Sequence, residues 1–181
     1  MKKDIPSIAS ILNDALTSGI LVFASASNVG ANDRITFPAR VHGVFCIGSA
    51  DTYGNRSRFS PPFEGEEKYS ALGEAVLAAC PVNFSNKPGY NGSKQMIRRD
   101  GTSTATPIAA GIGALLIDLT RQIMGKGKRA DIYDNIRKLF IGISEATAGK
   151  DYRYLALSYI FGPGKDSKAE IKNMISVPAG M

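Results

Sequence analysis

GTSTATPIAAG, at residues 101–111, is the stretch of this sequence that says most about the fold. Loop-type residues precede it, and apolar residues at regular spacing follow it, which predicts a helix from Thr102 to about Met124. Ser103 then lies in the first turn of that helix. There, unpaired backbone N–H groups and the positive end of the helix dipole favour a developing negative charge.

The same stretch has further features of a helix that packs on a sheet. Ala105, Ala109, Ala110 and Gly113 give a face of small side chains that can approach a sheet closely. Pro107 is near enough to the start to remove only an early intrahelical bond. A simpler interpretation of Ser103, as an ordinary helix-capping serine, stays open on these residues alone.

Upstream of this helix the pattern alternates between helix and buried strand. Apolar residues at helical spacing predict a helix from Ile5 to Leu16, which Gly19 ends. Continuous apolar runs at Ile20–Ala24 and Val44–Ile47 are typical of strands buried on both faces of a parallel sheet. The order of these elements predicts an α/β fold with helices flanking a parallel sheet.

The rest of the chain is less regular. Residues 51–101 are rich in Gly, Pro, Asn and Ser, which predicts a loop-dominated region, and a second helix is expected over Asp131–Phe140. We expect one domain over residues 1–162 and a polar, peripheral tail over residues 163–181.

Composition narrows the possible classes of protein. The 181 residues carry a formal net charge of +6, two cysteines and one histidine, so neither a metal cluster nor a disulfide scaffold is expected, and no cofactor is predicted. Cys46 lies in an apolar run, which favours buried thiols over a bridge to Cys80. Polar residues interrupt the apolar stretch near the N-terminus, no window reaches the length of a membrane span, and no membrane partner is expected. The compartment stays open.

The motifs then point to a family. Gly101-Thr102-Ser103, with Ala105 and Pro107, resembles the nucleophile motif Gly-Thr-Ser-x-Ala-x-Pro of the subtilisin-like serine proteases, the subtilases (peptidase family S8). The upstream stretch LVFASASNVG at residues 21–30 is similar to the strand and turn that deliver the oxyanion-hole asparagine of that family. The resemblance covers roughly residues 5–162 and implies a partial three-layer, subtilisin-like fold.

The resemblance also implies roles for particular residues. Ser103 falls on the catalytic nucleophile, and Asn28 falls on the oxyanion-hole donor. Ser25, Ala26 and Ser27 are predicted to remain from the first specificity pocket. Two positions depart from the family: Ser27 stands where glycine is usual, and Thr104 stands where a larger apolar residue is frequent.

The aspartate and histidine motifs of the family precede the oxyanion asparagine, and neither occurs here. The chain therefore resembles a C-terminal half with the N-terminal half missing, and we expect it to be inactive by itself. The edges of both apolar strands are expected to be bare. His42, in the pair His42-Gly43, is interpreted as a strand-entry residue rather than a base. Asp33 and Asp51 are interpreted as solvated loop carboxylates, and Asp100 as a loop-shaping residue.

Three functions are compatible with these patterns. The first is a region of a serine endopeptidase, which would act on a polypeptide substrate once completed by its missing half. The alternative is a non-catalytic interaction module that pairs a bare strand edge with another polypeptide. A basic nucleic-acid binder is the weakest, and no nucleic-acid partner is expected, because the basic residues are scattered and few aromatics lie among them; they are Arg98, Arg99, Arg121, Lys126, Lys128 and Arg129.

Overall fold

The chain forms an α/β fold of three layers. The computed structural model describes residues 6–30, 34–62, 68–79, 96–125, 129–146 and 153–176. In chain order the elements are α1 (Pro6–Thr17), β1 (Val22–Ser25), β2 (Val44–Ala50), β3 (Lys68–Leu72), β4 (Val76–Ala79), β5 (Met96–Arg99), α2 (Thr102–Met124), α3 (Arg129–Gly142), β6 (Ser144–Ala146), β7 (Arg153–Leu155), α4 (Ser158–Phe161) and α5 (Ser167–Ser176).

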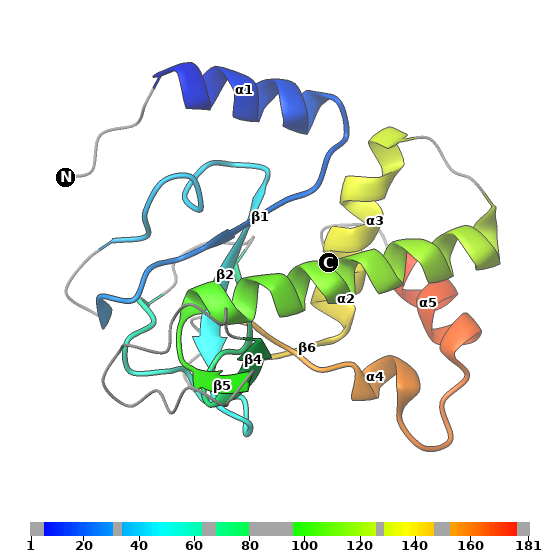
Figure 1. The fold of residues 1–181 in the computed structure, drawn as a ribbon. Coiled ribbons are helices and arrows are strands. Elements are labelled where there is room, and N and C mark those ends of the chain that lie inside the picture. The colour runs from blue at the N-terminus through cyan, green and yellow to red at the C-terminus, as the bar shows by residue number, and fades with distance from the viewer. Residues whose placement is uncertain are drawn as a thin grey trace.

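The central sheet has the order β1-β2-β3-β7-β6, and α2 crosses in front of its strands (Figure 1). Neighbours among β1, β2, β3 and β7 pair in parallel, while β6 pairs antiparallel with β7. The predicted parallel sheet is confirmed, with one antiparallel strand at its edge. A separate two-stranded antiparallel ribbon of β4 and β5 leads directly into α2.

Alternating side chains of β2 separate the two faces of the sheet, because successive residues of a strand point to opposite sides. Val44 and Cys46 pack with Leu12 of α1 on one face. On the other face, Phe45 and Ile47 belong to the larger core, which also holds residues of α2, α3 and α5. All seven residues of β2 are buried, as its apolar run predicts.

The small-residue face of α2 lies on this sheet, as expected. Ala105 and Ala109 are fully buried, and a Cβ placed on Gly113 would come within 2.8 Å of the Phe23 ring of β1. That ring stacks on Phe45 with a centroid distance of 5.0 Å. Gly113 therefore sets how closely the helix approaches β1. Ala110 lies beside this face and is only half-buried.

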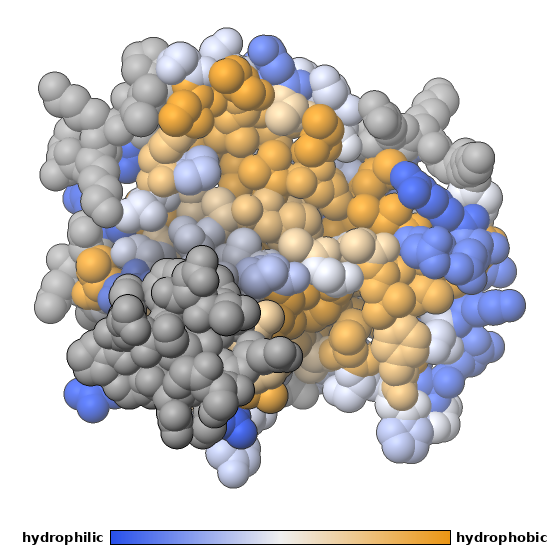
Figure 2. Space-filling view, in the orientation of Figure 1, coloured by the Kyte–Doolittle hydropathy of each residue, from blue (hydrophilic) through white to orange (hydrophobic). Residues whose placement is uncertain are grey.

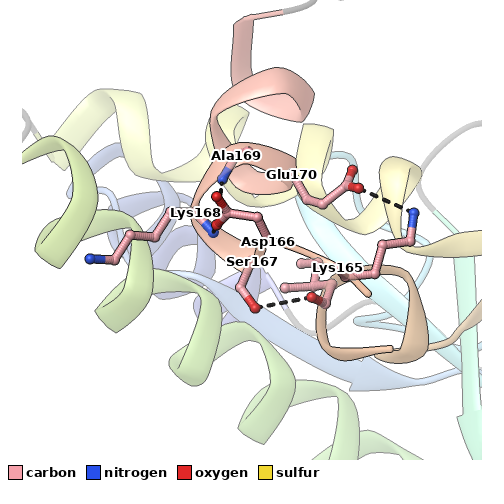
Figure 3. Close-up of polar contacts among 7 residues, drawn as sticks. Lys165, Asp166, Ser167, Lys168, Ala169 and Glu170 are labelled. Atoms are coloured by element: carbon pink, nitrogen blue, oxygen red, sulfur yellow. Dashed lines mark hydrogen bonds and ion pairs between the residues drawn. The ribbon is translucent and has the colours of Figure 1, made fainter. Parts of the chain in front are cut away.

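The segment expected to be a peripheral tail contributes to the core. Asp166 Oδ1 accepts the backbone N–H groups of Lys168 and Ala169 and so caps α5 (Figure 3). Ile171 is fully buried and Ile175 is 8% exposed, both within the larger core. The helix packs because these two apolar residues are one turn apart. The domain limits of 1–162 and 163–181 stay a prediction, but residues 167–176 are not peripheral.

Candidate active site

The start of α2 is fastened to the end of β3 through two glycines. Gly101 has φ 151°, a backbone angle that favours glycine. Its N–H donates to the carbonyl of Gly73 at 2.8 Å, and its own carbonyl accepts the Thr104 hydroxyl at 2.6 Å. A Cβ on Gly73 would collide with Ser49 Oγ and lie 2.8 Å from the Gly101 carbonyl oxygen. Gly101 is therefore required by its backbone angle, and Gly73 is required by the close approach of Ser49 and of the Gly101 carbonyl.

Thr102 connects the helix start to the turn that follows β1. Its backbone N–H donates to Asn28 Oδ1 at 2.8 Å, and its hydroxyl lies 3.0 Å from the same oxygen and 3.2 Å from the Ser27 carbonyl oxygen. Asn28 thus accepts one of the unpaired N–H groups of the first helical turn. Because Oδ1 is held by Thr102, the orientation of the Asn28 amide is fixed.

The fixed amide and the Ser103 hydroxyl both lie next to Gly101. Asn28 Nδ2 lies 3.4 Å from the position that a Cβ on Gly101 would occupy, and Ser103 Oγ lies 3.1 Å from that same position. The Ser103 side chain is exposed. The interpretation of Ser103 as a capping serine is not supported. The N-cap residue is Gly101, which has no side chain to bond the helix start, and the Thr102 N–H donates to Asn28 instead.

Ser27 has φ 149°, where an L-residue is strained. This is the position at which the family carries glycine, so the sequence departure coincides with a backbone angle that suits glycine. The carbonyl of Ser27 faces the Thr102 hydroxyl at 3.2 Å. The strained residue therefore helps to hold the Asn28–Thr102 arrangement.

The other two residues predicted for a specificity pocket differ in exposure. Ser25 is half-buried at the end of β1. Ala26 is fully buried, and its carbonyl accepts the Thr36 N–H at 3.0 Å and the Thr36 hydroxyl at 3.2 Å. Ala26 offers no exposed surface, whereas the pocket role of Ser25 and Ser27 stays a prediction.

His42 lies at the opposite end of the parallel strands from Ser103. It comes two residues before β2 and lines a hollow with Arg40 and Lys68. The Ser103 site instead sits where β1 and β3 end. Since β2 has seven residues and a strand rises about 3.3 Å per residue, the two sites are separated by about 20 Å along the sheet. His42 is a strand-entry residue, as predicted.

The two described carboxylates near these motifs have structural roles. Asp100 Oδ1 accepts the Ala75 N–H at 2.6 Å and so shapes the β4–β5 ribbon, as predicted. Asp51 closes a turn by accepting hydrogen bonds from the Asn55 side chain and from the backbone N–H groups of Asn55 and Tyr53. Partial desolvation acts to raise the pKa of the Asp51 carboxyl, but these hydrogen bonds hold that pKa below its ordinary value. Asp33 lies outside the described residues.

A buried serine cluster beneath the site was not expected from sequence. Ser49 and Ser57 hydrogen-bond through their hydroxyls at 2.7 Å, and the backbone N–H of Ser49 donates to Ser60 Oγ at 3.1 Å. These hydrogen bonds connect the end of β2 to the loop that follows it, and Ser49 packs directly against Gly73. The sequence signal was weak, because serines at positions 49, 57 and 60 are also typical of exposed turns.

Cys46 is a free, buried thiol, as predicted, and Cys80 lies outside the described residues. Burial raises the pKa of the Cys46 thiol to about 12, with the Lys68 ammonium acting in the opposite direction. A thiol of this kind is a poor nucleophile at neutral pH. Cys46 therefore belongs to the core and not to the chemistry.

Comparison with known proteins agrees with the geometry around Ser103. The model of the subtilase family, Peptidase S8, matches residues 1–164. The chain belongs to the subtilase family. Its membership confirms the resemblance seen at residues 21–30 and 101–107, and with it the assignment to a family of serine proteases.

Two curated relatives show how much of a subtilase is represented. The chain is 37% identical over 105 residues to alkaline elastase YaB of Bacillus sp. (strain YaB), a match that covers 58% of this chain and 24% of the relative. It is 34% identical over 105 residues to subtilisin Savinase of Lederbergia lenta, covering 58% of this chain and 34% of the relative. The chain thus matches about a third or less of the length of these relatives.

Solved structures show the same fold over most of this chain. The prenylagaramide maturation protease PagA superposes with a TM-score of 0.66 at 21% identity, covering 97% of this chain and 57% of that one. The PatG macrocyclase in complex with peptide gives a TM-score of 0.63 at 22% identity, covering 94% of this chain and 48% of that one. The predicted subtilisin-like fold is confirmed.

Proposed function

We propose that Ser103 is the nucleophile of a serine endopeptidase and that Asn28 donates to the oxyanion. One observation carries this proposal: the Asn28 amide is oriented by its hydrogen bond to Thr102. In that orientation, Nδ2 of Asn28 and Oγ of Ser103 lie near the same side of Gly101. Attack by Ser103 on a peptide carbonyl would place negative charge on the carbonyl oxygen. Preorganised donors at that point are the largest stabilising factor in acyl transfer.

The helix start would supply the second donor. The backbone N–H of Ser103 lies in the first turn of α2, where it has no intrahelical acceptor, and the dipole of a 23-residue helix favours an anion there. The assignment of the first donor to Asn28 rests on membership of the subtilase family together with the geometry.

The reaction also needs a general base. The only histidine of the chain, His42, lies at the end of the strands that is remote from Ser103. We propose that the proton of Ser103 is taken by a histidine outside these 181 residues, backed by the family's aspartate. Without that base the rate falls on the order of 10²- to 10⁴-fold. The chain by itself is then inactive as a protease, and its polypeptide substrate is bound only in a completed domain.

A fluorophosphonate probe tests the assignment. Purified chain is expected to react slowly and at Ser103 only, with the rate rising when imidazole is added as an external base. Mass spectrometry locates the adduct, and Ser103→Ala serves as the control. Labelling at another serine, or labelling unaffected by Ser103→Ala, would refute Ser103 as the nucleophile.

A further inference from the structure

Helix α2 packs on the rest of the described chain along one side. Its buried residues recur at helical spacing and include Ala105, Ala109 and Leu116 of the larger core. The helix is long and apolar enough to cross a membrane by length and composition, contrary to the expectation that no stretch would be, yet only 33% of its most apolar window is buried. Figure 2 shows a broad apolar surface on the face that carries α2. Because apolar packing holds the helix along this one side, the hydrogen bonds of its first turn matter for where that turn lies.

Two strands support that first turn, and they differ in how they are paired. Asn28, which accepts the Thr102 N–H, follows β1. Within the described part of the chain, β1 pairs on one side only, with β2, so the expected bare edge is found at β1. The expectation is wrong for β2, which lies between β1 and β3. Gly73, which accepts the Gly101 N–H, follows β3, and β3 pairs with β2 on one side and with β7 on the other. Gly73 therefore follows an interior strand, whose backbone is held from both sides.

The Thr104 hydroxyl connects the first turn of α2 to Gly73. Its Oγ1 donates to the carbonyl oxygen of Gly101 at 2.6 Å and lies 3.2 Å from the carbonyl oxygen of Gly73. Since a hydroxyl has a single proton, the two oxygens share it in a three-centre bond whose shorter arm is at Gly101. The Gly73 carbonyl also accepts the Gly101 N–H at 2.8 Å. These contacts among Gly73, Gly101 and Thr104, called here the Thr104 anchor, join the end of β3 to the turn that carries Ser103.

The Thr104 anchor differs from the local hydrogen bond that a helical threonine commonly makes to a carbonyl three or four residues earlier. Thr106 shows the local case, since its hydroxyl donates to the Thr102 carbonyl at 2.7 Å. The second acceptor of Thr104, Gly73, lies 31 residues earlier and at the end of another element. Thr104 is also a position at which the sequence departs from the subtilase motif, because a larger apolar residue is frequent there. An apolar side chain donates no hydrogen bond, so the Thr104 anchor belongs to this chain and not to the motif.

Ser103 lies between the two anchored residues of the turn. On one side the Thr102 N–H donates to Asn28 Oδ1 at 2.8 Å, and on the other side the Thr104 hydroxyl makes the contacts just described. The side chain of Ser103 is exposed, so its position follows from the backbone on either side more than from packing around it. A misplacement of about 1 Å at a reacting group lowers a rate by as much as roughly 10²-fold. The anchor of the neighbouring residue therefore bears on the reactivity of Ser103.

We propose that Thr104 is a positioning residue for Ser103. Its hydroxyl holds the first turn of α2 at the end of β3 and thereby fixes where Ser103 Oγ stands when it attacks a carbonyl. The Gly101 carbonyl transmits this effect, because it accepts the Thr104 hydroxyl and also the N–H groups of Thr104 and Ala105 that begin the helix, at 3.0 and 3.2 Å. The inference rests on the proposed function in one respect, since it takes Ser103 as the nucleophile.

Hydrogen exchange at the Gly101 amide, measured by NMR, tests the Thr104 anchor independently of any reaction. Thr104→Val keeps the shape of the side chain and removes its donor, so the Gly101 N–H should exchange on the order of tenfold faster. Thr104→Ser restores the donor and should return the exchange rate to within about twofold of the parent. Thr106→Val is the matched control, because it removes a helix hydroxyl bond to Thr102 and should leave the exchange of Gly101 unchanged. Unchanged exchange in Thr104→Val, or an equal rise in Thr106→Val, would overturn the proposal.

Fluorophosphonate labelling at Ser103, with a fixed concentration of imidazole as the base, tests the consequence for the nucleophile. Thr104→Val should be labelled on the order of tenfold more slowly than the parent, Thr104→Ser should recover most of the rate, and Thr106→Val should stay within about twofold. The same labelling rate in Thr104→Val and in the parent would overturn the positioning role. Failure of the proposed function gives a different result: no labelling of the parent at Ser103, together with faster Gly101 exchange in Thr104→Val, would refute the nucleophile and leave the Thr104 anchor standing.

Discussion

Replacing Ser27 by glycine should stabilise this protein, although glycine usually destabilises. Ser27 is held at φ 149° in the turn that presents Asn28. An L-residue in a sparsely populated backbone region costs on the order of 1–3 kcal/mol. Glycine adds roughly 0.5–1 kcal/mol of unfolded-state entropy, so the net gain in free energy of unfolding is about 0.5–2 kcal/mol.

The assay is denaturant unfolding followed by circular dichroism, with two matched variants. Ser27→Ala removes the hydroxyl but keeps the strained angle, and its stability should stay within about 0.5 kcal/mol of the parent. Ser25→Gly lies in β1 at an ordinary strand angle and should lose about 0.5–1 kcal/mol. If Ser27→Gly is destabilised as much as Ser25→Gly, the strain assigned to Ser27 is absent.

Three further predictions concern packing, hydrogen bonding and ionisation. Gly113→Ala should lose about 1–3 kcal/mol in thermal or chemical unfolding, because its Cβ would meet the Phe23 ring, while Gly111→Ala in the same helix should gain up to about 1 kcal/mol; equal effects would contradict the packing of α2 on β1. Thr102→Val should lose about 1–2 kcal/mol and Thr102→Ser much less, since only valine abolishes the hydroxyl contacts to Asn28 and Ser27; equal losses would mean that these contacts carry no weight. The pKa of Cys46 is raised from 9.0 to about 12, so the native thiol keeps its proton where the unfolded one loses it, and stability should fall as pH rises above 9; a Cys46→Ala variant with the same pH profile would contradict this.

Local patterns of apolar residues in the sequence predict much of the fold. Periodic apolar residues located α1 and α2 to within a few residues, and the continuous apolar runs located β1 and β2. Strand β3, with the sequence Lys68–Leu72, was missed because its lysine, tyrosine and serine make no apolar run. Its strand conformation depends on pairing with β2 on one side and β7 on the other, which are contacts distant in sequence.

The candidate site likewise contains residues that the sequence predicts and residues that it does not. Ser103 and Asn28 were predicted because each lies in a motif that can be recognised locally. Gly73 and the serines beneath it were not, since their role arises only when β2, β3 and α2 meet. The sequence of helix α5 does carry a local signal, an Asp166 cap and two isoleucines one turn apart.

Ser103 is, in the function proposed above, a nucleophile whose general base lies outside this chain. The most direct test of this proposal is the rate of fluorophosphonate labelling at Ser103, measured on the isolated chain with and without added imidazole. We expect slow labelling of the isolated chain without imidazole, and labelling that becomes faster as the imidazole concentration rises. Rapid, stoichiometric labelling of the isolated chain at Ser103 would contradict it, because a base would then already be present.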